Sequence, residues 1–155
     1  MEENRVNYAY AEIGLIEVPG EISLCIGFTG CPNHCKGCHS EELWDKEYGV
    51  PFDKDTLQDL MEKYKGKVSC ICFMGGDWNP EELLSYIKMA KGARFVTALY
   101  VGTDTFYVEF LEYLDYIKLG AYKEECGGLS SRDTNQKMWK KENNDWIDIT
   151  RSFWR

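Results

Sequence analysis

The chain of 155 residues has the length of one domain, and 44% of its residues are apolar, which excludes wholesale disorder and low-complexity scaffolding. We therefore expect a single domain over residues 1–155. The formal charge of −8 disfavours nucleic acid as a main partner, because an acidic surface repels phosphate backbones. Without a secretory signal at residues 1–5 or an apolar run long enough to cross a bilayer, a cytoplasmic protein that binds no membrane is expected.

The first half of the sequence predicts one or two strands over residues 9–18, then a strand, a helix and a further strand. Residues 9–18 and 22–28 have strand-like apolar character, and a Pro-Gly turn separates them. Asp53 is a suitable N-cap for a helix that runs to about Lys65, with apolar residues recurring at the helical interval. Residues 68–74 are short and apolar, as expected of a strand buried on both faces.

The next segment predicts a second helix and a further strand. Asn79 is expected to cap the helix, Pro80 suits its first position, and Glu82 stands where a capping box needs an acid. Gly92 is expected to end this helix. Residues 94–100 then have the apolar character of a strand.

The remaining segments continue the alternation of helix and strand. A third helix is expected over residues 104–114, a short strand over 116–119, and a hairpin over 138–150. Alternating strands and helices favour an α/β fold with a parallel sheet, either a partial (β/α) barrel or an open, mostly parallel sheet. In both architectures functional groups gather at the carboxyl ends of the strands.

Three cysteines follow the second predicted strand within eight residues. Cys31, Cys35 and Cys38 have the spacing C-x3-C-x2-C, which allows one loop to wrap one iron–sulfur cluster. Three ligands for four irons would leave one iron open to a reactant, as in a catalytic zinc site. A structural zinc ion held by the three thiolates and His34 or His39 is the alternative.

The other cysteines suggest a different role. Cys25, Cys70 and Cys72 lie in apolar predicted strands, where a free cysteine usually behaves as a small buried hydrophobic residue. We therefore expect them in the core rather than at a metal site.

Four segments together resemble the radical S-adenosylmethionine superfamily and, within it, the small activating enzymes of anaerobic ribonucleotide reductase. The cysteine loop alone specifies the superfamily, and the other three segments narrow the resemblance to the family. The resemblance spans about residues 5 to 150, and its segments are Thr29 to His39, Met74-Gly75-Gly76-Asp77, Asp115 to Tyr122 and Thr134-Asn135-Gln136.

This resemblance implies the cofactors and the reaction. It implies a [4Fe–4S] cluster on Cys31, Cys35 and Cys38, with S-adenosylmethionine at the fourth iron. It further implies reductive cleavage of S-adenosylmethionine and formation of a glycyl radical on the large subunit of anaerobic ribonucleotide reductase. A reduced flavodoxin or ferredoxin is the expected electron donor.

The resemblance also assigns residues that would bind S-adenosylmethionine. Gly75, Gly76 and Asp77 match the motif that holds the methionine end. The glycines allow close approach of the backbone, and the carboxylate can accept hydrogen bonds from the ammonium group. Lys118 is a candidate partner for the cofactor's carboxylate, with a solvated surface lysine as the alternative. For the adenine, the candidates are His39 and Phe28.

Three other functions remain open from the sequence. An activase of another glycyl-radical enzyme would use the same cofactors on a different target. A zinc-stabilised binding module would have no catalytic activity. A simple electron carrier is less favoured, because such a protein gains nothing from an open iron.

Overall fold

The computed structural model describes residues 6–30, 45 and 48–154. The described residues form one sheet of eight strands with helices on one side, in the strand order β3-β1-β2-β4-β5-β6-β7-β8. The strands are β1 (Val6–Gly14), β2 (Ser23–Phe28), β3 (Val50–Phe52), β4 (Cys70–Met74), β5 (Val96–Tyr100), β6 (Tyr116–Leu119), β7 (Lys137–Glu142) and β8 (Asp145–Asp148). The helices are α1 (Lys54–Tyr64), α2 (Pro80–Gly92), the short α3 (Phe110–Tyr113) and a 3-10 turn (Thr150–Phe153).

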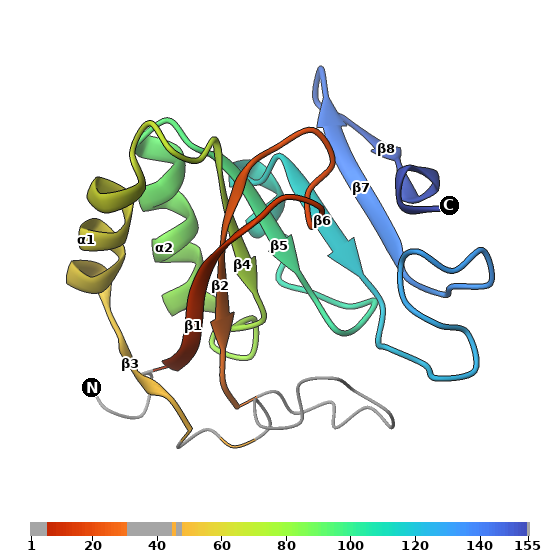
Figure 1. Ribbon diagram of the computed structural model, residues 1–155, viewed down its shortest axis with the longest axis horizontal. Coiled ribbons are helices and arrows are strands. Elements are labelled where there is room, and N and C mark those ends of the chain that lie inside the picture. The colour runs from red at the N-terminus through yellow and green to blue at the C-terminus, as the bar shows by residue number, and fades with distance from the viewer. Residues whose placement is uncertain (1–5, 31–44, 46–47, 155) are drawn as a thin grey trace.

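The centre of the sheet is parallel and its margins are antiparallel (Figure 1). Strands β2, β4, β5 and β6 run parallel to one another. Strands β1 and β3 are added antiparallel on one side, and β7 and β8 on the other. Because the order begins at β3 and ends at β8, the sheet is open rather than closed into a barrel. The expected α/β fold with an open sheet is confirmed, and the expected parallel arrangement holds for the four central strands.

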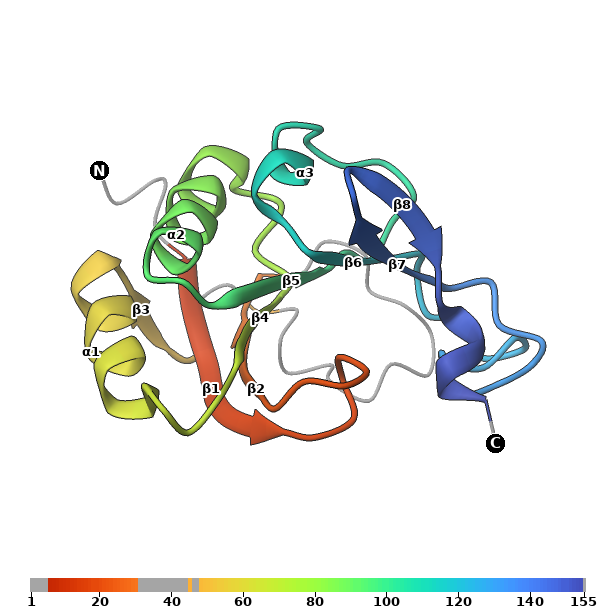
Figure 2. The ribbon, with the colours of Figure 1, turned by 90° about the horizontal axis from the view of Figure 1, so that it is seen from above.

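Helices α2 and α3 lie on one side of the sheet, and the segment between β1 and β2 lies on the other (Figure 2). The helix side holds the main core, where alternate residues of the parallel strands pack against α1, α2 and α3. No helix among the described residues is long and apolar enough to span a membrane.

We call the opposite side of the sheet the inner face. It holds a second apolar cluster built from the other set of alternate strand residues, with Val18 from the β1–β2 segment packed onto it. The hydroxyls of Tyr100 and Tyr116 donate to the carbonyls of Glu17 and Pro19, at 2.6 and 3.4 Å. The β1–β2 segment therefore crosses the inner face. The sequence predicted strand structure as far as residue 18, but β1 ends at Gly14.

The predicted caps of α1 and α2 had different outcomes. The carboxylate of Asp53 accepts from the backbone N–H of Thr56 at 2.8 Å, which confirms the predicted N-cap of α1. Asn79 makes no side-chain capping hydrogen bond, although Pro80 starts α2 as predicted. The capping box is also wrong, because the carboxylate of Glu82 accepts from the hydroxyl of Tyr86 one turn later.

The third helix is much shorter than its predicted range of 104–114. Only Phe110–Tyr113 is α-helical. The carbonyl of Thr103 accepts from the backbone N–H of Gly120 at 3.0 Å, which ties this segment to the end of β6. The Thr103 hydroxyl donates to the carbonyl of Thr105 at 2.6 Å, a local turn that competes with helix formation. The edge strand β3 was not predicted at all.

The predicted hairpin near the C-terminus is confirmed as β7 and β8. The two strands are joined by Asn143 and Asn144, with φ angles of 51° and 69°. Asparagine tolerates the left-handed region better than most residues, and a two-residue turn with both φ angles positive matches the twist of a hairpin.

Candidate functional site

The carboxyl ends of the four parallel strands meet at one edge of the sheet, where the motif segments also lie. Gly75 and Gly76 follow β4, Gly120 follows β6, and Thr29 and Gly30 follow β2. The proposed cluster ligands Cys31, Cys35 and Cys38, and also His39, lie outside the described residues, so their roles stay predictions.

The turn after β4 requires glycine at two successive positions. Gly75 and Gly76 have φ angles of 87° and 84°, in the left-handed region that disfavours side chains. A Cβ atom at Gly75 would lie 2.7 Å from the ring of Trp78, and one at Gly76 would lie 3.1 Å from the ring of Phe28. The backbone N–H of Gly75 donates to the carbonyl of Tyr100 at 3.1 Å. The turn is thus held between β2 and β5 with its backbone at the carboxyl edge.

Phe28 is not available to pack against an adenine from the inner face. It is 1% exposed and lies in the core on the helix side, where its ring meets that of Phe52 edge-on at a centroid distance of 5.1 Å. The expectation for Phe28 is therefore wrong. Alternation along β2 explains this, because residues 24, 26 and 28 all face the helices.

Lys118 is a buried cation and not a solvated surface lysine. It is 7% exposed, and its ammonium donates to the carbonyls of Val101 at 3.3 Å and Gly120 at 3.1 Å. The same ammonium lies 5.3 Å from the centroid of the Tyr100 ring, a cation–π distance. The inner face thus presents a fixed positive charge just below the carboxyl edge.

Asp77 lies within electrostatic reach of Lys118. Burial raises the pKa of Asp77, while a backbone hydrogen bond and the positive charge of Lys118 act in the opposite direction. Asp77 follows the glycine turn at the carboxyl end of β4, and Lys118 lies near the carboxyl end of β6 at the same edge of the sheet. Together they match a ligand that carries both an ammonium and a carboxylate group.

The fourth motif segment packs against the end of β6. The amide of Gln136 donates to the carbonyl of Gly120 at 3.3 Å, and the amide of Asn135 donates to that of Ala121 at 3.0 Å. Gly120 has a φ angle of 106°, and a Cβ atom there would lie 3.2 Å from the Cα of Gln136. Two motif segments that are distant in sequence therefore form one structural unit. No individual role was predicted for Gln136, and its place in the motif was the only signal for it.

A row of side chains crosses the inner face directly below this edge. The strand registers align Tyr10, Gly27, Met74, Tyr100, Lys118 and Met138 across six strands. The places of Tyr10 and Tyr100 in this row were not predicted from the sequence, because alternation shows which residues share a face only when the strand pairing is known.

Cys25 and Cys72 lie one row further from the edge than Gly27 and Met74, and Cys70 lies another row away. Cys25 and Cys72 are register partners, and both are buried together with Cys70. Burial raises the pKa of Cys70 to about 12. The pKa of Cys72 is also raised, first by its hydrogen bond with Cys25 and then by burial. Thiols that stay protonated are poor metal ligands and nucleophiles, so the expected core role is supported.

No group of three or more potential metal ligands occurs among the residues that the structure describes. A cluster would therefore depend on the segment 31–38, which contains three cysteines. Three thiolates are a suitable donor set for an iron–sulfur cluster with one open iron. An amino acid ligand beside such a cluster would suit the groups described above, which are Gly75, Gly76, the carboxylate of Asp77 and the ammonium of Lys118.

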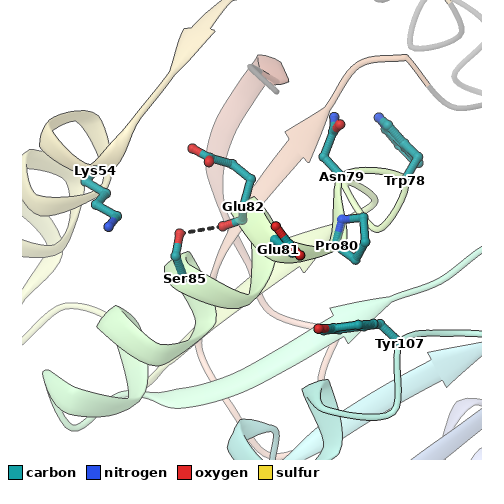
Figure 3. Close-up of a pocket in the computed structure, with 8 residues that line it drawn as sticks. All are labelled: Lys54, Trp78, Asn79, Pro80, Glu81, Glu82, Ser85 and Tyr107. Atoms are coloured by element: carbon teal, nitrogen blue, oxygen red, sulfur yellow. Dashed lines mark hydrogen bonds between the residues drawn. The ribbon is translucent and has the colours of Figure 1, made fainter. Parts of the chain in front are cut away.

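A separate cavity lies outside this edge, at the start of α2 (Figure 3). It has a volume of about 440 Å³ and is lined by Lys54, Trp78, Asn79, Pro80, Glu81, Glu82, Ser85 and Tyr107. Two lining residues contact the motif: Trp78 packs against Gly75, and the backbone N–H of Asn79 donates to the carbonyl of Gly76 at 3.0 Å. The cavity contains none of the sequence-predicted site residues, so the inner face at the carboxyl edge is the better candidate site.

Comparisons with known proteins indicate the family of the chain. Residues 18–147 match the family model described as a 4Fe-4S single cluster domain. The chain is 29% identical over 140 residues to the anaerobic ribonucleoside-triphosphate reductase-activating protein of Pasteurella multocida, covering 79% of this chain and 85% of that protein. It is 25% identical over 120 residues to the pyruvate formate-lyase-activating enzyme of Clostridium pasteurianum, covering 72% of this chain and 50% of that enzyme. No solved structure matches the chain significantly.

The fold and the site define an α/β protein whose motif residues gather at the carboxyl edge of a parallel sheet. The chain belongs to the family of 4Fe-4S single cluster domains, whose model covers most of its length. With the two similar activating proteins, this match confirms the expected radical S-adenosylmethionine enzyme and its cofactors, a [4Fe–4S] cluster and S-adenosylmethionine. It also favours a cluster over the alternative of a single zinc ion.

Proposed function

We propose that the protein activates an anaerobic ribonucleotide reductase by generating a glycyl radical on its large subunit. The main support is that the motif segments after β4 and β6, and Gln136, converge at the edge where the cysteine-bearing segment follows β2. Similarity over 85% of an activating protein for anaerobic ribonucleoside-triphosphate reductase favours this target.

In this proposal the protein holds and shields two cofactors. Bound together, they would supply the chemistry of reductive S-adenosylmethionine cleavage. Cys31, Cys35 and Cys38 would hold three irons, and a reduced flavodoxin or ferredoxin would supply the electron. His39 would contact the nucleoside half.

The described residues would orient the methionine half. Gly75 and Gly76 would let the backbone approach it closely, because neither residue has a side chain. Asp77 would accept hydrogen bonds from its ammonium group, and Lys118 would donate to its carboxylate. The carbonyls of Val101 and Gly120 hold the Lys118 ammonium in place before the ligand arrives, which reduces the entropy lost on binding.

Anaerobic purification followed by incubation with dithionite and S-adenosylmethionine tests the chemistry. We expect about four iron and four sulfide per chain, and 5′-deoxyadenosine as a product. Cys35→Ala should abolish both the cluster and the product. Cys126→Ala is the matched control, because this partly buried cysteine lies outside the motif. A colourless protein with one zinc ion and no product would contradict the proposal.

A second candidate target is another glycyl-radical enzyme, which the similarity to a pyruvate formate-lyase-activating enzyme favours. The chain spans only half the length of that enzyme, which makes this target the weaker candidate. The activated protein should be incubated separately with an anaerobic ribonucleotide reductase and with a pyruvate formate-lyase. A glycyl radical signal in electron paramagnetic resonance on the first alone is the expected result, and a signal on the second alone would change the target.

A further inference from the structure

The ring of Tyr10 lies directly over Gly27 on the inner face. The two residues are register partners on β1 and β2, and a Cβ atom at position 27 would overlap with the Tyr10 ring. The Tyr10 hydroxyl reaches past Gly27 to donate to the sulfur of Met74 on β4, at 3.4 Å. An aromatic ring thus covers the inner face of β2 where the strand itself supplies no side chain.

This ring lies close to the segments proposed to hold the cofactors. Met74 directly precedes Gly75, and Gly27 is four residues before Cys31 in the sequence. Tyr10 and Met74 are both partly exposed. Their accessible surfaces therefore form the part of the inner face between the end of β2 and the glycine turn after β4.

The two ends of the row of aligned residues on the inner face differ in charge. On β5 and β6, the Tyr100 ring already faces the ammonium of Lys118 at 5.3 Å. On β1 and β4, the corresponding surface consists of the Tyr10 ring and the Met74 thioether. Lys118 repels a second cation from its own half, whereas a neutral ring attracts one. Burial raises the pKa of Tyr10, so its side chain remains a neutral phenol.

We propose that the Tyr10 ring, positioned by Gly27, binds the sulfonium centre of S-adenosylmethionine through a cation–π interaction. This inference rests on the proposed function and adds a binding residue to it. A sulfonium ion has no N–H or O–H group and cannot be recognised by hydrogen-bond donation to a carboxylate. An aromatic face and a polarisable thioether are well suited to such a cation. Lys118 would then hold the carboxylate at the other end of the row.

The test compares S-adenosylmethionine with S-adenosylhomocysteine, which has a neutral thioether instead of the sulfonium. Binding to the anaerobically reconstituted protein should be measured by equilibrium dialysis, without reductant and without turnover. Tyr10→Leu should lower the affinity for S-adenosylmethionine about tenfold and the affinity for S-adenosylhomocysteine less than about twofold. Tyr10→Phe, which keeps the ring, should leave both affinities within about twofold of the wild type.

Two variants separate a binding role from a packing role. Tyr64→Leu, which removes a partly buried tyrosine from α1 on the opposite side of the sheet, should change neither affinity. Gly27→Ala should displace the Tyr10 ring. Like Tyr10→Leu, it should lower the affinity for S-adenosylmethionine more than the affinity for S-adenosylhomocysteine. Should Tyr10→Leu fail to fold, progressively fluorinated phenylalanines at position 10 keep the ring's shape while reducing its attraction for cations.

The inference would be overturned if Tyr10→Leu lowered the affinities for both ligands equally or changed neither. Affinity that does not fall with fluorination would also overturn it. A wild-type protein that forms a cluster but binds neither ligand would instead contradict the proposed function, so the two failures are distinguishable.

Discussion

Lys118 and Gln136 donate to the same carbonyl oxygen, that of Gly120, at 3.1 and 3.3 Å. A carbonyl oxygen has two lone pairs and can accept both donors. The shared acceptor joins β6 to the segment that precedes β7, although these two residues are 18 positions apart in the sequence. The position of the buried ammonium therefore depends on both motif segments.

Replacing Lys118 should affect ligand binding more than folding. Lys118→Met keeps much of the side-chain volume but removes the cation, so we expect S-adenosylmethionine to bind about 30-fold more weakly, as for the loss of one hydrogen bond to a charged group. Thermal unfolding without ligand should change little, because the methionine avoids the cost of burying a charge. Equilibrium dialysis and a melting curve provide the two measurements.

Lys88→Met is the matched control for this prediction. The ammonium of Lys88 also lies over a tyrosine ring, 5.1 Å from the centroid of Tyr113, but on the helix side of the sheet. This variant should leave the affinity for S-adenosylmethionine unchanged. Equal weakening by both variants would argue against a specific role of Lys118.

Asp77 should make the stability of the ligand-free protein depend on pH. Burial raises its pKa in the folded state. The folded protein then binds more protons than the unfolded chain between the two pKa values, so stability falls as the pH rises through this window and stays lower above it. Asp77→Asn removes the titration, and we expect it to be more stable than the wild type near pH ~7.

Thermal unfolding of both proteins between about pH 4 and 7 checks this expectation. The advantage of Asp77→Asn should shrink towards acidic pH, where the wild-type carboxyl group is protonated in both states. A difference that grows on acidification would instead indicate that the pKa of Asp77 is lowered in the folded protein. Asp148→Asn is a useful contrast, because hydrogen bonds with Thr150 and the charge of Lys137 lower the pKa of Asp148 despite its partial burial.

The features predicted best from the sequence were those that depend on neighbouring residues. The cap at Asp53, the buried strand around Cys72 and the turn at Asn143-Asn144 each follow from local backbone chemistry. The alternation of strands and helices also predicted the parallel order in the centre of the sheet. The place of Gly75 at the carboxyl edge then followed from topology, whereas Lys118 was suggested only by the family resemblance.

The features that were missed depend on pairing between distant strands. Tyr10 reaches the inner face beside Met74 only because β1 adds antiparallel to β2, and nothing near Tyr10 in the sequence specifies this partner. Residues 104–109 have a helical apolar pattern, yet the contact between Thr103 and Gly120 prevents that helix. Glu82 illustrates competition for one side chain, since Tyr86 takes the carboxylate that a capping box requires.

The cap of α1 should contribute to stability without affecting the site. Asp53→Ala removes the acceptor for the backbone N–H of Thr56, and we expect the free energy of unfolding to fall by about 1 kcal/mol. Asp55→Ala is the control, because this residue lies in the first turn but is not the cap. Urea unfolding should separate the two variants, and neither should change the affinity for S-adenosylmethionine. An equal loss in both would assign the effect to the helix dipole rather than to the cap.

The glycine turn after β4 should be sensitive to substitution for two separable reasons. Gly66 has a φ angle of 80°, and no atom lies within 4 Å of the place that a Cβ atom would take. Gly66→Ala should therefore lower the free energy of unfolding by only about 1–2 kcal/mol. Gly75→Ala has the same backbone cost, and its Cβ atom would also meet the ring of Trp78 at 2.7 Å. We therefore expect a further loss of about 1–3 kcal/mol from overpacking.

A double-mutant cycle with Trp78→Ala separates these two contributions. In the Trp78→Ala background, Gly75→Ala should cost about as much as Gly66→Ala, because only the backbone strain remains. Urea unfolding of the four proteins of the cycle gives the coupling energy between positions 75 and 78. A coupling near zero would mean that the Trp78 ring does not restrict the turn, and the requirement for glycine at position 75 would then be due to its φ angle alone.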